Sequence, residues 1–138
     1  MKAPPPQSSA KSCACGSGRT YEDCCGRFHA GTPPPDAEAM MRSRYCAYVR
    51  LDEAYLLATW HPTTRPLRLD LDQGPRTQWL GLDIKRHVTT GEDSAIVEFV
   101  ARFKIGGRAQ RLHETSRFTR TEGRWYYVDG EFPDGPKP

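Results

Sequence analysis

The sequence lacks any long run of apolar residues. Across its 138 residues there is no stretch of about 18 apolar residues, the length that a membrane-spanning helix needs. Its beginning, MKAPPPQSS, has one lysine but lacks the apolar core of a secretory signal. We therefore expect a cytoplasmic protein that does not act in a membrane.

The chain also lacks a strong excess of charge. Its formal net charge of +3 is too small to indicate nucleic-acid binding by itself. A basic set does gather toward the C-terminal half: Arg102, Lys104, Arg108, Arg111, Arg117 and Arg120. Acidic residues (Glu98, Glu114, Glu122) are interleaved with this set, which is typical of a solvated face. Nucleic acid, including ribosomal RNA, is therefore only a secondary expectation.

Proline, serine and cysteine divide the chain into segments. Residues 1–10 are rich in proline and serine without an apolar anchor, which predicts a disordered lead-in. Residues 11–30 hold a cysteine cluster, and residues 31–35 form a proline-rich linker. Residues 36–132 are long enough for one modest core, and residues 133–138 are a tail.

Beyond the linker the apolar residues first follow a helical spacing. Asp36 is a candidate N-cap. An apolar stripe with spacings of three and four residues follows it: Ala37, Met41, Tyr45 and Tyr48. A second short helix can begin at Asp52, with Leu56, Leu57 and Trp60 on one face, and Pro62 stops it. Residues 62–78 contain prolines and a glycine and predict a long irregular connection.

The remaining sequence alternates as strands do. Strands are predicted over residues 79–88, 95–105, 110–120 and 124–129. In the first strand we expect one buried face, made of Leu80, Leu82, Ile84 and Val88. Gly106-Gly107 predicts a tight hairpin turn. Two helices before an antiparallel meander give an α+β fold, with the helices packed on the concave face of a curled sheet.

Four of the five cysteines lie within thirteen residues: Cys13, Cys15, Cys24 and Cys25. Clustered cysteines in a reducing compartment favour a shared metal ion over disulfides. Four thiolates suit the tetrahedral geometry of zinc, and Gly16-Ser17-Gly18 lets the backbone reverse between the ligands. The sequence thus predicts one structural Zn²⁺ on a small knuckle.

The fourth zinc ligand has two candidates, Cys25 and His29, of which we favour Cys25. A site of four cysteines leaves no open position for water, so zinc catalysis is not expected. The site would carry a charge of about −2, which Lys11, Arg19 and Arg27 can offset. The fifth cysteine, Cys46, is expected to be a small buried apolar residue.

The knuckle resembles the SEC-C motif, the zinc knuckle at the end of the SecA preprotein translocase, where histidine usually stands in place of Cys25. The whole chain after residue 10 is similar to the YchJ family, through Met41-Arg42-Ser43-Arg44-Tyr45, Thr59-Trp60-His61-Pro62, His113-Glu114-x-Ser116-Arg117-Phe118 and Arg124-Trp125-Tyr126-Tyr127-Val128-Asp129-Gly130. This resemblance implies a cone-shaped domain similar to nuclear transport factor 2, and no established activity. The SecA knuckle binds the SecB chaperone and ribosomes, which implies a protein or ribosome partner here.

The predicted strand over residues 110–120 places Glu114 and Ser116 on its apolar, inward face. An inward carboxylate must be hydrogen-bonded, paired or protonated. One interpretation is a ligand pocket with Glu114 as general base and His61 as acid. The alternative, which we favour, is a buried pair of Glu114 with an arginine that fixes helix against sheet. The candidate pocket residues are Arg44, Trp60, His61, Glu114, Ser116 and Trp125.

Two functions follow from these features. The leading hypothesis is an adaptor whose knuckle contacts a protein or the ribosome. The other is a cone-shaped domain that binds a small molecule, or a small enzyme of the isomerase or dehydratase type. The sequence favours a binding role over catalysis.

Overall fold

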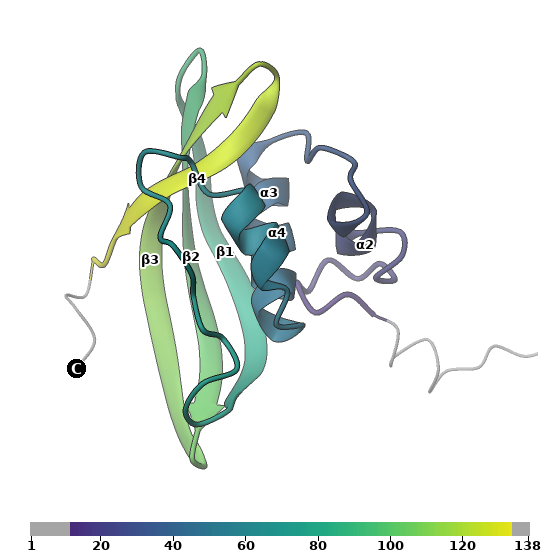
Figure 1. Cartoon of the computed structure of the whole chain (residues 1–138), viewed down its shortest axis with the longest axis vertical. Coiled ribbons are helices and arrows are strands. Elements are labelled where there is room, and N and C mark those ends of the chain that lie inside the picture. Colours follow the sequence, from purple (N-terminus) through teal and green to yellow (C-terminus); the bar gives the residue numbers. More distant parts are fainter. Residues whose placement is uncertain (1–11, 134–138) are drawn as a thin grey trace, which may run out of the picture.

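The structure, a computed structural model, describes residues 12–133 (Figure 1). The predicted lead-in at 1–10 and nearly all of the predicted tail lie outside these residues. The elements follow in the order α2 (Cys25–His29), α3 (Ala37–Val49), α4 (Glu53–Ala58), β1 (Thr77–Gly91), β2 (Ser94–Ile105), β3 (Arg108–Thr121) and β4 (Arg124–Glu131). None of the helices in this part of the chain is both long enough and apolar enough to cross a membrane.

The four strands form one antiparallel sheet in the order β1-β2-β3-β4. Figure 1 shows the long strands bending around α3 and α4, which lie on the same face of the sheet. The β2–β3 turn uses Gly106 and Gly107 at φ +59° and +81°, a region that glycine enters without steric cost. The predicted α+β class and meander are confirmed.

Along β2 and β3, buried and more exposed side chains alternate as the sequence predicts. Val97 and Phe99 are buried on β2, and Ser116 and Phe118 are fully buried on β3. Each pair lies two residues apart, the period of a strand with one buried face. These residues form the floor of the core.

Strand β1 departs from the prediction at Leu80, which is 46% exposed. The register shifts between Trp79, opposite Phe103, and Gly81, opposite Arg102, so Leu80 is the extra residue of a β-bulge. The bulge turns Trp79 toward the core and Leu80 toward solvent. Simple alternation misplaced Leu80 because a bulge changes the face of every residue that follows it.

Helix α3 is buried on more than the predicted stripe. Met40, Ser43 and Cys46 are also buried, each 2% exposed or less. The sheet covers one side of the helix, and the knuckle and α4 cover the others (Figure 1). The predicted stripe is confirmed at Ala37, Met41 and Tyr45, and burial extends further around the helix because α3 packs against neighbours on several sides.

Helix α4 is shorter than predicted and ends at Ala58, before Trp60. The chain then pairs with β4: the Tyr127 N–H donates to the Thr59 carbonyl at 2.9 Å, and the His61 N–H donates to the Tyr127 carbonyl at 2.7 Å. Leu56 anchors the short helix through complete burial, which contributes about 1.5–3 kcal/mol.

The knuckle shares one core with the cone-shaped domain. Cys13 and Cys15 belong to the same buried cluster as Met41 on α3 and Phe99 on β2. The proline-rich linker at 31–35 therefore connects two parts that pack against each other.

Replacing Asp36, the N-cap of α3, tests how much the cap contributes to the stability of the protein. The Asp36 side chain accepts a hydrogen bond from the Ala39 N–H at 2.8 Å. Asp36→Ala should lower the free energy of unfolding by about 1 kcal/mol, because an N–H at the helix start loses its acceptor. Urea unfolding measures this, with Asp72→Ala on the irregular connection as the control. Equal midpoints for both variants would contradict the prediction.

Candidate functional site

The four cysteines of the knuckle meet in one buried cluster. The Sγ atoms of Cys13, Cys15, Cys24 and Cys25 all lie within 4.8 Å of one another. Each side chain is at most 6% exposed. Two of the sulfur pairs, Cys15–Cys24 and Cys24–Cys25, are 3.6 and 4.0 Å apart.

The local sequence builds this cluster with a tight loop and a short helix. Ser12 and Thr20 pair as an isolated antiparallel β-bridge, and the Cys13 N–H donates to the Arg19 carbonyl at 2.9 Å. These contacts close the loop. Gly16 and Gly18 take positive φ values of +84° and +89°, so the loop can turn within few residues. Helix α2 then begins at Cys25 and directs it toward the other thiols.

The cluster fits a tetrahedral metal ion. Thiolates that share one zinc ion at about 2.3 Å stand roughly 3.8 Å apart, close to the sulfur separations found here. Hydrogen bonds from the Cys13 and Cys25 thiols hold the pKa of Cys15 well below its usual range, whereas burial raises the pKa of Cys24. A divalent cation would stabilise all four as thiolates, since metal binding releases thiol protons.

His29, the other candidate for the fourth ligand, points away from the cluster. Its Nδ1 lies 2.6 Å from the Tyr21 hydroxyl, and its Nε2 lies 2.9 Å from the Ser43 carbonyl. Both ring nitrogens are thus engaged: Nδ1 within the knuckle, and Nε2 with α3. The structure brings Cys25, not His29, together with the other three cysteines.

Cys46 contacts the cluster from helix α3. It is 1% exposed, as a buried apolar residue would be, and its Sγ lies 3.3 Å from that of Cys13. The sequence showed no ligand spacing for Cys46, because only the docking of the knuckle on α3 brings these thiols together. Cys46 thus packs directly against a candidate ligand.

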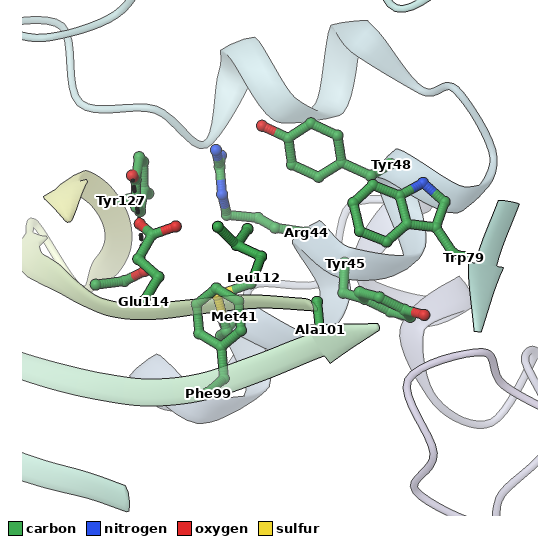
Figure 2. A pocket seen from close by; sticks show the side chains of 11 residues that line it. Met41, Arg44, Tyr45, Tyr48, Trp79, Phe99, Ala101, Leu112, Glu114 and Tyr127 are labelled. Carbon is green, nitrogen blue, oxygen red and sulfur yellow. Dashed lines mark hydrogen bonds between the residues drawn. The ribbon is translucent and has the colours of Figure 1, made fainter. Parts of the chain in front are cut away.

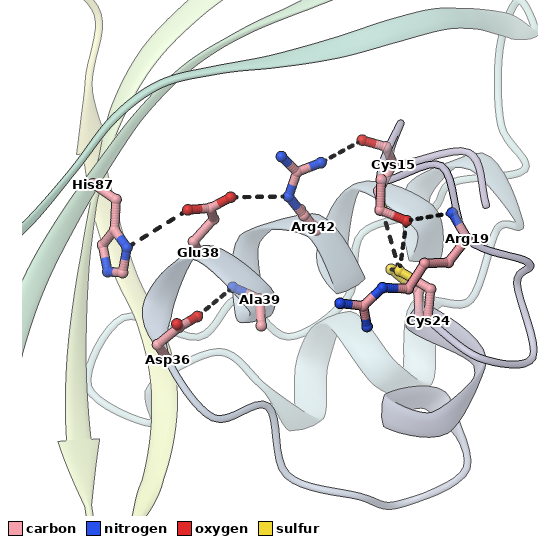
Figure 3. A network of polar contacts seen from close by, with 10 residues as sticks. Cys15, Arg19, Cys24, Asp36, Glu38, Ala39, Arg42 and His87 are labelled. Carbon is pink, nitrogen blue, oxygen red and sulfur yellow. Dashed lines mark hydrogen bonds and ion pairs between the residues drawn. The ribbon is translucent and has the colours of Figure 1, made fainter.

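A polar network ties the knuckle to the helix and the sheet (Figure 3). Arg42 donates to the Cys15 carbonyl at 2.7 Å and to Glu38 at 3.1 Å. The other Glu38 oxygen lies 3.7 Å from His87 on β1. Sequence reasoning missed Arg42, although its spacing of four residues from Glu38 was a usable signal for an ion pair on one helix face.

A cavity of about 220 Å³ lies between α3 and the concave face of the sheet (Figure 2). Its walls are mostly apolar or aromatic, with a few polar side chains at one end. The lining residues are Met41, Arg44, Tyr45, Tyr48, Trp79, Phe99, Ala101, Leu112, Glu114, Ser116 and Tyr127.

Glu114 places a carboxyl group in this cavity. Its Oε2 accepts hydrogen bonds from the Ser116 hydroxyl at 3.0 Å and the Tyr127 hydroxyl at 2.9 Å. Burial raises the pKa of Glu114, while these two hydrogen bonds act in the opposite direction. The carboxyl group is therefore held in place by two neutral donors.

Arg44 places a guanidinium group near the same end of the cavity. Its Nη1 donates to the Leu56 carbonyl at 2.9 Å and to the Thr59 hydroxyl at 2.7 Å. Within residues 12–133 it forms no ion pair with Glu114. The buried pair of Glu114 with an arginine favoured from the sequence is thus present as an attraction between two buried groups, each of which is hydrogen-bonded to neutral partners.

The other expected pocket residues lie elsewhere. Trp60 stacks behind Arg44, with its ring centre 4.9 Å from the guanidinium carbon. His61 Nδ1 lies 2.8 Å from the Thr63 hydroxyl, outside the cavity lining. Trp125 lines a separate hollow beside Phe28 in the knuckle. Only Arg44, Glu114 and Ser116 of the expected six share the cavity, so the acid–base pair of Glu114 and His61 does not form.

Two family models match the chain. The model described as "YchJ, middle NTF2-like domain" covers residues 36–130, and the SEC-C motif covers residues 11–27. A UPF0225 protein of Xanthomonas campestris pv. campestris is 54% identical over 125 residues, 90% of this chain and 97% of that protein. The chain belongs to the YchJ-like UPF0225 family.

Solved structures of similar proteins share the arrangement of this UPF0225 chain. A SEC-C motif containing protein from Rhodopseudomonas palustris matches with a TM-score of 0.77 and 38% identity, covering 87% of this chain and 97% of that one. Another from Psychrobacter arcticus matches with a TM-score of 0.74 and 28% identity, covering 96% and 86%. The expected cone-shaped fold behind a SEC-C knuckle is thus confirmed.

Metal content distinguishes the candidate ligands from their neighbour in this family member. Cys24→Ser should reduce the bound metal from about one ion per chain to nearly none, because three remaining thiolates leave the tetrahedron open. Cys46→Ala should keep the metal, since the four-thiol set remains complete. Elemental analysis by mass spectrometry of the purified variants measures both. Metal loss in Cys46→Ala with retention in Cys24→Ser would reverse the assignment.

Because Gly130 has no side chain, the Glu114 carboxyl group can lie against its Cα. A Cβ built at Gly130 would lie only 1.9 Å from Glu114 Oε2. Gly130→Ala should therefore displace the carboxyl group and lower the free energy of unfolding by about 1–3 kcal/mol. The same substitution in a Glu114→Ala background should cost much less. A double-mutant cycle by urea unfolding measures the difference, and equal costs in both backgrounds would contradict the steric account.

Proposed function

We propose that this protein is a cytoplasmic adaptor whose knuckle holds one zinc ion and presents a surface to a protein partner. The observation that carries the proposal is the closed cluster of four buried cysteine thiols, beside which the side chains of Arg19 and Arg27 are exposed. The cytoplasm suits such a site because its thiols stay reduced there.

Zinc is the metal that this donor set favours. Soft thiolates select zinc, copper(I) or iron–sulfur clusters, and a tetrahedral set of four is typical of structural zinc. With all four positions filled by protein, no site remains for a metal-bound water. The ion would fix the shape of the loop and supply no chemistry of its own.

The surface beside the ion has the features of a recognition site. A groove of about 280 Å³ runs between the knuckle and α3, and its charged lining residues are three arginines and two acids: Arg19, Arg27, Arg42, Asp36 and Glu38. Arg42 forms an ion pair with Glu38, whereas the side chains of Arg19 and Arg27 are exposed on the knuckle. Guanidinium groups at the rim of a groove favour an acidic segment of a partner protein.

The similarity to the SEC-C motif supports the same role. The SecA knuckle that this segment resembles binds the SecB chaperone and ribosomes, so protein contact is the function carried by analogy. Ribosome binding is the second form of this proposal. The basic set on the sheet is a weaker basis for RNA binding, since Arg102, Arg117 and Arg120 each pair with an acidic side chain.

Quantitative pull-down from cell extract tests the adaptor role. Partners should be lost from Cys24→Ser, which lacks the metal, and also from Arg19→Glu/Arg27→Glu, whose metal content is measured in parallel because Arg27 Nε donates to the Cys24 carbonyl at 3.2 Å. The charge reversal should reduce partner recovery by about tenfold or more, because two opposite-charge contacts become repulsive.

Lys104→Glu/Arg108→Glu on the β2–β3 hairpin is the matched control, with the same change in net charge. It should keep every partner of the wild type. Ribosome sedimentation of the same four proteins separates ribosome contact from contact with a free protein. If the metal-free and the charge-reversed variants both retained every partner, the adaptor proposal would be contradicted.

A second candidate function is small-molecule binding in the cone cavity. It is favoured by the presence of a cavity that holds two ionisable side chains, Arg44 and Glu114, against apolar walls. An isomerase- or dehydratase-like activity has less support, because His61 does not line the cavity with Glu114. The second candidate function is therefore binding of a small molecule without catalysis.

A further inference from the structure

The cavity contains a buried positive charge whose hydrogen-bond partners are neutral and which the nearby Glu114 carboxyl group attracts without an ion-pair contact. Arg44 is 2% exposed, and its Nη1 donates to a carbonyl and a hydroxyl. Its guanidinium carbon lies 4.5 Å from the centre of the Tyr127 ring and 4.9 Å from that of Trp60. Aromatic faces and neutral acceptors offset only part of the cost of burying a charge.

Among the described residues Arg44 forms no ion pair, although it is the buried cation of this cavity. The nearby carboxyl group of Glu114 is held by Ser116 and Tyr127 through its Oε2. A buried guanidinium is the residue type best suited to bind a carboxylate through two parallel hydrogen bonds. The guanidinium therefore has the chemistry to bind a small anion in this cavity.

Glu114 adds a second point of recognition. Both hydrogen bonds from described residues reach its Oε2, and its Oε1 receives none. Figure 2 shows Glu114 and Arg44 directed into the same end of the cavity. Burial raises the pKa of this carboxyl group, and the charge of Arg44 acts in the opposite direction. An oxygen in this position can accept a hydrogen bond from a ligand hydroxyl.

The rest of the cavity suits an apolar body. Phe99, Leu112 and Trp79 supply apolar walls to it (Figure 2). A volume of about 220 Å³ is smaller than the 300–1,000 Å³ or so of typical drug-sized sites, which favours a small ligand.

We propose that the cone cavity binds a small 2-hydroxy carboxylic acid with an aromatic or branched apolar tail. Its carboxylate pairs with Arg44, its hydroxyl donates to Glu114, and its tail lies against Phe99 and Leu112. Adjacent hydroxyl and carboxylate groups match a polar end at which Glu114 and Arg44 lie near each other. This inference rests on the proposed binding of a small molecule in the cavity and adds the chemical class of that molecule.

Calorimetric titration with three matched compounds tests the assignment. The probes are 3-phenyllactate, its neutral amide, and 3-phenylpropanoate, which lacks the hydroxyl. Phenyllactate should bind about tenfold or more tightly than the amide, because only the acid pairs with the guanidinium. It should also bind more tightly than phenylpropanoate, and Glu114→Gln should reduce that hydroxyl preference.

Leu112→Trp fills the cavity and leaves both charged residues in the sequence, and it should abolish phenyllactate binding. Leu80→Trp makes the same change at the exposed bulge on β1 and should leave binding unchanged. Arg44→Lys keeps the charge but loses the paired donors, so binding of the acid should weaken about tenfold or more. Arg44 also contacts the end of α4, so weaker binding by Arg44→Lys is attributed to the lost donors only if the variant unfolds at a near-native temperature. Leu112→Trp tests the site independently.

The outcomes separate the two levels of the proposal. If acid and amide bind equally well and Leu112→Trp abolishes both, the cavity binds small molecules but the anionic class is wrong. If none of the three compounds binds at millimolar concentration, or if binding survives in Leu112→Trp, both the ligand class and the binding role of the cavity are overturned.

Discussion

The structure depends on helix α3 being packed on several sides at once. On one side lies the sheet, and on another the cysteine cluster, where Cys46 of the helix meets Cys13 at 3.3 Å. The knuckle has no separate core, since its cysteines belong to the same buried cluster as Met41 and Phe99. Any metal bound there would therefore stabilise the whole domain, because ligand binding to the native state shifts the unfolding equilibrium.

One short segment of α3 serves both candidate sites. Arg42 binds the Cys15 carbonyl, Arg44 enters the cone cavity, and Cys46 touches the cysteine cluster. Residues four apart share a helix face, so Arg42 and Cys46 both reach the knuckle, whereas Arg44 between them points to the opposite side and reaches the cavity. The helix is the element through which the metal centre and the cavity share a scaffold.

The cavity keeps two polar groups that a purely structural core would avoid. Replacing buried charged groups with apolar residues is often neutral or stabilising, so Arg44 and Glu114 add cost unless they act on something. Gly130 shows how closely the fold is built around them, because any Cβ there would strike the Glu114 carboxyl group. The geometry of this end of the cone is matched to a carboxyl group in a defined position.

The sequence by itself determined the α+β class, the strand pattern and the four clustered cysteines, because periodicity and short-range spacing are local properties. It also placed Glu114 and Ser116 on an inward face. Only the tertiary structure decided the exposure of Leu80, which follows from a bulge in the pairing of β1 with β2. It alone brought Cys46 to Cys13 and separated His61 from Glu114, because those relations depend on how distant segments pack.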